Sequence, residues 1–212
     1  MLTRKHGKSL MVLLFAAGTV AACSEKAAPT SPSQGAISTE SPAVQGNNAG
    51  QSGLAAVRQA TAAFHDIKKA VAAGYLSPIG GRCVASPAGA MGVHSVNPLL
   101  VQNPALDPEA PEALLYVPTG GGNYRLVGVE YIQPVLLRNT ATNQIAPWFP
   151  QSPWPASYVV VNQVPSLFGQ TFQGPMPGHE PGAPWHYDLH VWLWSPNPDG
   201  MFAQWNPSLT CE

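Results

Sequence analysis

Residues 112–133, EALLYVPTGGGNYRLVGVEYIQ, decide the fold. The two runs 112–117 and 124–133 are rich in apolar and aromatic side chains, which is typical of β-strands. The turn between them, residues 119–123, has three glycines followed by an asparagine, a composition that favours a tight hairpin. We therefore expect a β-hairpin over these residues.

The rest of the chain supplies further strands and one clear helix. Apolar side chains recur at helical spacing between Ser52, which can cap the start, and Gly74, which can end it. Further strands are expected at 92–96, 156–162 and 186–194, and long proline-rich loops at 135–155 and 165–184. The expected class is α+β: one long N-terminal helix packed on a mostly antiparallel, bent sheet or half-barrel.

The N-terminus predicts export and lipid anchoring. Basic residues precede the apolar run 10–17, and Val-Ala-Ala-Cys at 20–23 matches a bacterial lipobox, the signal for lipidation at the cysteine. Residues 1–22 are expected to be a lipoprotein signal peptide and Cys23 the acylated first residue. The alternative is a secretory signal that is cleaved nearby, with Cys23 incidental. In a Gram-negative cell, Ser24 after the cysteine indicates the outer membrane.

Composition divides the rest of the chain into a tether and one domain. Residues 23–51 contain almost no large apolar side chains, and we expect a flexible, lipid-anchored tether there. Residues 52–212 have a usual size for a single globular domain. No later stretch is apolar and long enough to cross a membrane. The formal net charge of −1 and the lack of a basic patch argue against nucleic acid as a partner.

Cys83 and Cys211 remain once Cys23 is assigned to the anchor. In an oxidising compartment, two remaining cysteines most simply form a disulfide. A metal site built on the two thiolates is the rival interpretation. It is the weaker of the two, because the chain has no Cys-x-x-Cys motif.

The candidate functional site begins with residues 186–194, HYDLHVWLW. In a β-strand, successive side chains point to opposite faces of the sheet. One face therefore carries Tyr187, Leu189, Val191 and Leu193, an ordinary core face. The other face carries His186, Asp188, His190, Trp192 and Trp194. Two imidazoles and a carboxylate in one row are unusual for a face that only meets solvent.

Two further residues are predicted to complete a metal site. His94 and Glu130 each stand among small or apolar residues. A glutamate in such surroundings lies either at an exposed edge or in a cavity with a partner. Such nitrogen and oxygen donors suit Zn²⁺, Cu²⁺, Ni²⁺ or Fe²⁺. We expect His94, Glu130 and His186 to bind the ion, with His190 as the alternate ligand. We expect Asp188 to orient one of the histidines.

Two Met-x-x-His pairs point to copper among these metals, because thioether and imidazole groups suit Cu(I). The pairs are Met91 with His94 and Met176 with His179. The second pair lies in a segment of turn-forming residues. We therefore interpret His179 as coincidental to the site.

Three interpretations without a metal compete with this one. The polar residues could form a hydrogen-bonded structural layer under a loop, covered by Trp192 and Trp194. Tyr131 and the two tryptophans could instead line a pocket for a small ligand or a sugar. Asp188 with either histidine could serve as a base and its orienting partner. Nucleophilic hydrolysis is disfavoured, because the chain has no nucleophile-elbow serine motif and its cysteines are otherwise assigned. The sequence names no reaction.

Several motifs occur together in a fixed order. They are MGVHSVNP (91–98), EALLY (112–116), VGVEY (127–131), HYDLHVW (186–192), NPDGMF (197–202) and WNP (205–207), followed by Cys211. As a set they resemble a group of uncharacterised secreted or lipid-anchored bacterial proteins. The resemblance covers about residues 55–211 and implies one domain with a Cys83–Cys211 bridge. It brings no established activity and so assigns no catalytic residue.

Overall fold

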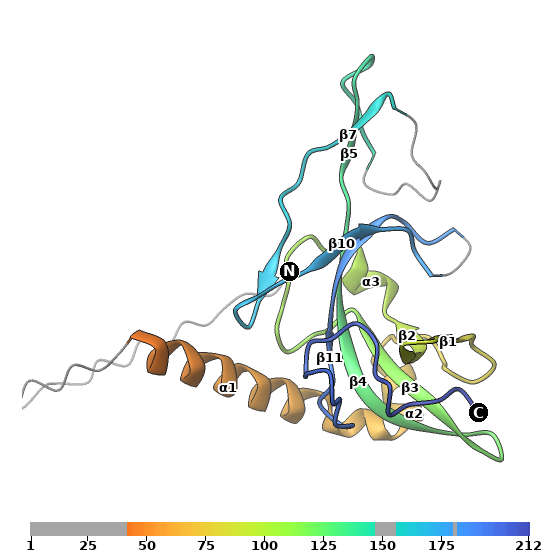
Figure 1. Ribbon diagram of the computed structural model, residues 1–212. Coiled ribbons are helices and arrows are strands. Elements are labelled where there is room, and N and C mark those ends of the chain that lie inside the picture. Colours follow the sequence, from red (N-terminus) through yellow and green to blue (C-terminus); the bar gives the residue numbers. More distant parts are fainter. Residues whose placement is uncertain (1–41, 147–155, 180–181) are drawn as a thin grey trace, which may run out of the picture. The chain divides into compact units, whose positions relative to one another are not determined.

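The computed structural model describes residues 42–146, 156–179 and 182–212 (Figure 1). The predicted signal peptide and Cys23, the predicted lipidation site, lie outside the described residues, as does the predicted tether up to residue 41. Within the described ranges, no helix is long and apolar enough to span a bilayer.

One curled antiparallel sheet dominates the domain, which confirms the expected mostly antiparallel, bent sheet of an α+β fold (Figure 1). Each strand pairs antiparallel with its neighbours. Across the sheet the strands follow the order β1 (Cys83–Ser86), β2 (Gly89–Val96), β3 (Ala113–Gly120), β4 (Asn123–Pro134), β11 (His186–Val191) and β10 (Gln173–Met176). The predicted strands 92–96, 112–117, 124–133 and 186–194 all fall in this sheet, although β11 ends at Val191.

The predicted hairpin is confirmed at the centre of the sheet. Gly120 pairs with Asn123 across a two-residue turn in which Gly121 and Gly122 both have positive φ. A turn with positive φ at both central residues matches the right-handed twist of the strands that it joins. Two irregularities, between Leu115 and Tyr116 and between Pro118 and Gly120, shift the register along the hairpin, and Glu130 of β4 then lies opposite Ala113 of β3.

The two predicted loops contain short strands. Within 135–155 lie β5 (Leu137–Asn139) and β6 (Ile145–Ala146), which form a small sheet with β7 (Tyr158–Val160). Within 165–184 lie β8 (Ser166–Leu167) and β9 (Gln170–Thr171), which pair with each other, and also β10. These strands have two to four residues each, too short to show a clear alternation in the sequence.

The prediction of one long helix over 52–74 is wrong. The helical region consists of α1 (Pro42–Thr61), the 3-10 turn η1 (Ala62–His65) and α2 (Ile67–Ala72). Ser52 lies inside α1 and does not cap it. The break comes at Asp66, whose backbone is extended and whose carboxylate accepts a hydrogen bond from the Lys68 amide, so that it caps α2. Gly74, with φ of 97°, ends α2 as expected.

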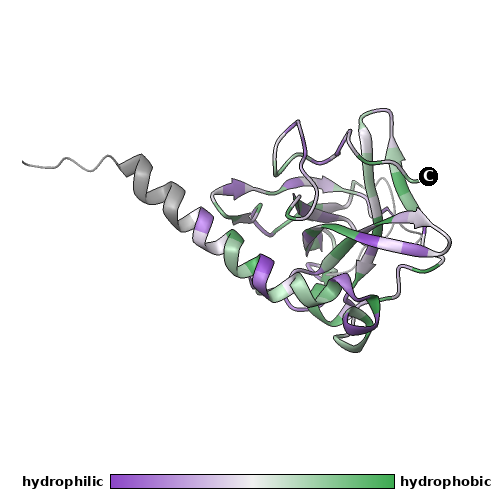
Figure 2. Cartoon of the chain, turned by 90° about the horizontal axis from the view of Figure 1, so that it is seen from below, coloured by the Kyte–Doolittle hydropathy of each residue, from purple (hydrophilic) through white to green (hydrophobic). Residues whose placement is uncertain are grey.

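The helical region α1–η1–α2 covers one face of the main sheet, and the apolar core lies between this region and the sheet. Along the described part of α1, hydrophobic and hydrophilic residues interleave, as in a helix with one buried face (Figure 2). Val57 of α1 is fully buried, and it packs in one cluster with the apolar side chains of the sheet. The sheet supplies Leu114, Tyr116, Val129, Tyr131, Tyr187, Leu189 and Val191 to this cluster. The predicted core face of residues 186–194 is therefore confirmed.

A smaller apolar cluster lies on the opposite face of the sheet. Leu115, Val117 and Trp192 pack there with Leu209 and Cys211 of the C-terminal segment. The predicted disulfide between Cys83 and Cys211 is confirmed, with a Cα–Cα distance of 5.7 Å. It ties the C-terminal segment to the edge of the sheet at β1. A structural disulfide is typical of proteins that fold in an oxidising compartment.

Gly92 holds β2 against β3 at a place where no side chain fits. Its φ is 92°, and an added Cβ would overlap the carbonyl oxygen of Tyr116. We expect Gly92→Ala to lower the free energy of unfolding by about 3 kcal/mol, through backbone strain and overpacking. Gly122 is the matched control, because its φ is also positive but nothing lies within 4 Å of an added Cβ. Gly122→Ala should cost only about 1 kcal/mol, and equal losses in urea denaturation would contradict the prediction.

Candidate metal centre

The candidate ligands lie on the face of the main sheet that the helices do not cover. On β11, His186, Asp188 and His190 alternate with Tyr187 and Leu189, whose side chains belong to the main core. On β4, Glu130 stands between two residues of the same core. Alternation along each strand therefore directs the polar side chains to the opposite face. Asp188, Glu130 and His190 are nevertheless at most 1 % exposed.

The strand register brings three candidate ligands together: His94, Glu130 and His190. His190 of β11 is the direct partner of Glu130 of β4, and their Nε2 and Oε1 atoms are 3.9 Å apart. His94 comes from β2, two strands away from β4, across a distance of about 10 Å in a regular sheet. In this register His94 pairs with Leu115 of β3, which pairs with Gly128 of β4, so Glu130 lies two residues further along β4, opposite the small Ala113. The His94 side chain therefore reaches Glu130, with Nε2 3.4 Å from Oε2.

Asp188 lies between the two histidines of its own strand. Its Oδ2 atom is 3.9 Å from Nε2 of His186 and 3.8 Å from Nδ1 of His190. The ring of His186 is held from the other side, with Nδ1 3.1 Å from the carbonyl oxygen of Pro184. A neutral imidazole that donates from Nδ1 to a carbonyl keeps a lone pair on Nε2, the form that binds metals.

His179, in the segment after β10, completes the cluster. Its ring centre is 5.3 Å from that of His94 and 5.9 Å from that of His186. Arg82, next to the disulfide, donates a hydrogen bond from Nη1 to the carbonyl oxygen of His179. The segment that carries His179 is thus attached to the β1 end of the sheet.

These residues form two sets whose donor atoms lie within 4.8 Å of one another. The first set is His94, Glu130 and His190, and the second is Glu130, His179, His186 and Asp188. A tetrahedral ion with bonds of about 2.0–2.1 Å places its ligand atoms about 3.4 Å apart. The donors of either set could therefore hold a metal ion after small side-chain movements.

The donor atoms lack the hydrogen bonds that buried polar atoms usually make. Within the described residues, both ring nitrogens of His190 and Nε2 of His94 have no hydrogen-bond partner, and the carboxyl groups of Glu130 and Asp188 find a hydrogen-bond partner only in each other, when Glu130 carries a proton. Each unsatisfied buried group costs about 1–3 kcal/mol. An apolar set of side chains would avoid this cost, so the arrangement favours a bound cation over a purely structural layer.

Burial sets the protonation of these groups in the metal-free protein. Desolvation, with the nearby His179 and His186, lowers the pKa of His94 to about 3, and desolvation lowers that of His186 to about 4. The pKa of His190 also lies well below its usual value because of burial. Desolvation raises the pKa of Asp188 to about 7, and desolvation and the negative charge of Asp188 raise that of Glu130 well above its usual value. The imidazoles are therefore neutral, and the carboxyl groups retain protons that a metal ion would displace.

The structure brings together every residue that the sequence predicted for the metal site, but it divides them into two ligand sets that differ from the predicted one. His94 and His186 fall in different sets, with Glu130 common to both, whereas one ion was expected to join all three. His190 belongs to the first set and is more than an alternate. Asp188 lies beside both histidines of β11, as an orienting residue would, and it also offers a ligand atom.

His179 was interpreted as coincidental, and the structure places it in the second set. The signal for it in the sequence is the repeated Met-x-x-His pair. In a segment of glycine and proline, however, no periodicity shows which way a side chain points.

The tryptophans do not form the expected cover. Trp192 is buried in the smaller apolar cluster, and its ring stacks on that of His190. Trp194 packs instead against the main core and the ring of His65, because the strand ends at Val191 and the alternation stops there. Tyr131 also lies in the main core. These three aromatic residues therefore do not line a common pocket.

Comparisons of the chain with protein families, with curated proteins and with solved structures find no match. The chemistry of the site therefore rests on the geometry described above.

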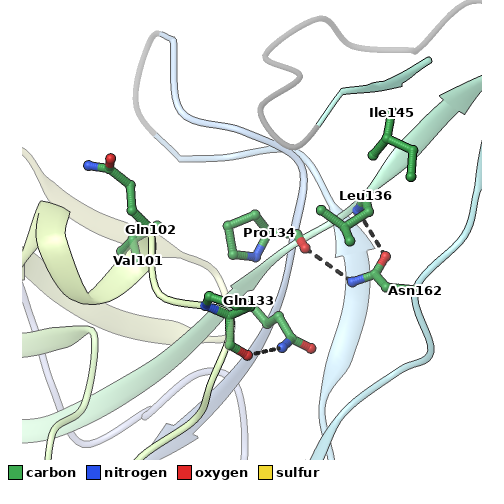
Figure 3. A pocket seen from close by; sticks show the side chains of 8 residues that line it. Val101, Gln102, Gln133, Pro134, Leu136, Ile145 and Asn162 are labelled. Carbon is green, nitrogen blue, oxygen red and sulfur yellow. Dashed lines mark hydrogen bonds between the residues drawn. The ribbon is translucent and has the colours of Figure 1, made fainter.

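A separate cavity of about 950 Å³ lies at the end of β4 (Figure 3). Its wall is fixed by Asn162, whose side chain donates to the carbonyl oxygen of Pro134 and accepts from the amide of Leu136. The lining residues are Val101, Gln102, Pro104, Gln133, Pro134, Leu136, Ile145 and Asn162. None of them is titratable, so the cavity is distinct from the metal centre. Pro134 is the strand partner of His186, which places the cavity at one end of the ligand row.

The affinity for a metal should fall as the pH drops below about 7. The raised pKa values of Asp188 and Glu130 mean that these carboxyl groups bind protons in the metal-free protein at pH 6 and must release them to bind an ion. We expect the apparent Kd for Zn²⁺ to rise by about tenfold per pH unit for each proton displaced. Calorimetric titrations at pH 6 and pH 8, in buffers of different ionisation enthalpy, measure the apparent Kd and the number of protons released on binding. Binding at pH 6 without proton release would contradict the prediction.

Proposed function

We propose that this chain is an extracytoplasmic lipoprotein whose domain binds a transition metal ion in the His/Glu/Asp cluster. The ion would serve metal handling or chemistry on a small molecule. The observation that carries the proposal is the two ligand sets joined at Glu130, in which the buried ring nitrogens of His190 and Nε2 of His94 have no hydrogen-bond partner among the described residues. Neutral imidazoles and carboxylates suit Zn²⁺, Cu²⁺, Ni²⁺ or Fe²⁺.

Charge also supports a cation in the cluster. Two carboxyl groups lie among neutral histidines in a region where the ionised forms are strongly disfavoured. A divalent ion would balance two carboxylate charges and replace the protons that otherwise neutralise them. This charge balance by one ion is possible only in the folded chain, because the ligands come from β2, β4, β11 and the segment after β10.

The test is the metal content of the full chain, purified without a histidine tag. We expect at least one equivalent of Zn, Cu, Ni or Fe per chain by mass spectrometry. We also expect a chelator-treated sample to melt at a higher temperature when Zn²⁺ or Cu²⁺ is added. An ion at 100 times its Kd stabilises the folded state by about 2.7 kcal/mol. The absence of stoichiometric metal together with unchanged melting would overturn the proposal.

A histidine outside the cluster provides a control. His65 is exposed and packs on Trp194, so His65→Ala removes one imidazole without touching either ligand set. Metal content and metal-dependent melting should be the same as in the wild-type chain. A loss in this variant would show that the bound ions belong to surface histidines.

A second candidate function is metal-free binding of a small molecule in the cell envelope. The observation that favours it is the cavity at the end of β4, whose volume lies in the range of small-molecule sites, about 300–1,000 Å³. Its aliphatic side chains and three amide groups, Gln102, Gln133 and Asn162, suit an uncharged ligand of mixed polarity. Such binding would persist in protein stripped of metal, which distinguishes the two candidates.

A further inference from the structure

We infer that the cluster holds two metal ions side by side, with Glu130 as the ligand that they share. This inference rests on the proposed function and goes beyond it in the number and arrangement of the ions. The first ion would lie with His94, Glu130 and His190, and the second with Glu130, Asp188, His186 and His179. Glu130 is the one residue common to both sets among the described residues.

One ion cannot account for all six side chains. Donor atoms bound to one tetrahedral ion lie about 3.4 Å apart, and opposite donors of an octahedral ion about 4.2 Å apart. Within each set every donor lies within 4.8 Å of the others, but no set contains both His94 and His186. An ion placed in the second set would therefore leave the buried imidazoles of His94 and His190 without a metal contact.

Glu130 has the properties of a bridging carboxylate. Its oxygens Oε2 and Oε1 lie 3.4 Å and 3.9 Å from Nε2 of His94 and of His190, both ligands of the first set. One oxygen also lies within 4.8 Å of a donor atom of each other residue of the second set. Both oxygens are buried, and neither accepts a hydrogen bond within the described residues. A carboxylate that joins two ions about 3.5–4 Å apart must have both oxygens available in this way.

His190 and Asp188 link the two positions. The two ring nitrogens of His190 face different carboxylates, Nε2 toward Glu130 and Nδ1 toward Asp188. With Nε2 bound to the first ion, Nδ1–H is placed to donate to Asp188, which belongs to the second set. This is the carboxylate–histidine–metal arrangement that fixes the ring and its tautomer.

Charge predicts the order of binding. The second set offers two carboxylates and two imidazoles, so one divalent ion there leaves no net charge. The first set adds two imidazoles but no further carboxylate, so another divalent ion leaves two positive charges in a buried site. A water molecule that binds both ions and loses one proton to solvent, becoming hydroxide, would reduce the excess to one charge. The ion at His94 and His190 should therefore bind more weakly than the other.

The test is the stoichiometry of Zn²⁺ binding to the full, disulfide-bonded chain stripped of metal with a chelator. All samples carry Cys23→Ser, which removes a thiol that would bind zinc. Calorimetric titration should give two ions per chain with different affinities. His94→Ala should remove the weaker ion and leave the tighter one unchanged, and His65→Ala should leave both. His94→Gln serves as the second variant if His94→Ala folds poorly, as judged by melting without metal.

Co²⁺ gives an independent readout, because two paramagnetic ions that share a carboxylate couple magnetically. We expect the electron paramagnetic resonance signal per ion to weaken when the second equivalent is added. Binding of a single ion to the wild-type chain, or loss of both ions in His94→Ala, would overturn the inference and leave the proposed function standing. Absence of any bound ion would overturn both.

Discussion

Glu130→Gln is expected to weaken metal binding more than any other single substitution in this chain. Glu130 is the only ligand that belongs to both sets among the described residues, so its loss affects every ion that the cluster holds. We expect the affinity for Zn²⁺ to fall by at least about 100-fold, because even residues that only orient a ligand are worth about 10–100-fold. The measurement is calorimetric titration of the metal-free protein at pH 8.

The same variant should not be less stable without metal. Because burial raises the pKa of Glu130, its ionised form destabilises the fold at any pH above the pKa of the unfolded chain, and this penalty is absent at low pH. Glu130→Gln removes the penalty, so we expect its free energy of unfolding at pH 8, without metal, to equal or exceed that of wild type. A large loss of stability at pH 8 would mean that the variant misfolds.

Glu112 offers a matched control for Glu130. It is also buried, and desolvation raises its pKa to about 7, but its Oε2 accepts a hydrogen bond from the Ile132 amide and it belongs to neither ligand set. Glu112→Gln keeps an acceptor for that amide. Because the charge of Glu112 also raises the pKa of Glu130, its removal should change metal affinity slightly, and far less than Glu130→Gln does. Equal loss of affinity in both variants would show that any change of a buried charge disturbs the cluster.

Loss of the disulfide should have the largest effect on stability. Cys83 and Cys211 are 128 residues apart, and closing so long a loop restricts the unfolded chain strongly. The chain-entropy relation gives about 5 kcal/mol for such a loop. We expect the double variant Cys83→Ser/Cys211→Ser to unfold at a much lower urea concentration than wild type. The slope of its free energy of unfolding against urea should be similar. A loss below about 1 kcal/mol would indicate that the unfolded chain is already compact without the bridge.

The parts of the fold that were predictable are those with strong local signals. The glycine turn at 119–123 and the alternation at residues 186–191 are local patterns, and they suffice to locate β3, β4 and β11. The helix was predicted to be continuous because its apolar spacing runs on past Asp66. The Asp66 side chain instead caps a new helix, α2, by accepting a hydrogen bond from the Lys68 amide. Periodicity reports which face of a helix is buried, and it does not report where the helix is interrupted.

The members of the site were more predictable than their grouping. A buried glutamate and an alternating His-Asp-His row mark candidate ligands in the sequence itself. Their partners depend on strand register and on the small Ala113 between β2 and β4, which no local pattern encodes. His179 depends on the path of a segment rich in glycine and proline, which is held by Arg82 from the far edge of the sheet.

The order of the strands has a consequence for when the protein can acquire its metal. His94 enters the sheet early in the sequence, whereas His186 and His190 come from β11, which joins β4 only when nearly all of the domain has been made. Each ligand set is completed only by Glu130, which lies far from residues 179–190 in the sequence, so folding is needed to assemble either set. If the domain binds a metal ion as proposed and the chain leaves the cytoplasm unfolded, the ion would be supplied by the compartment where the domain folds.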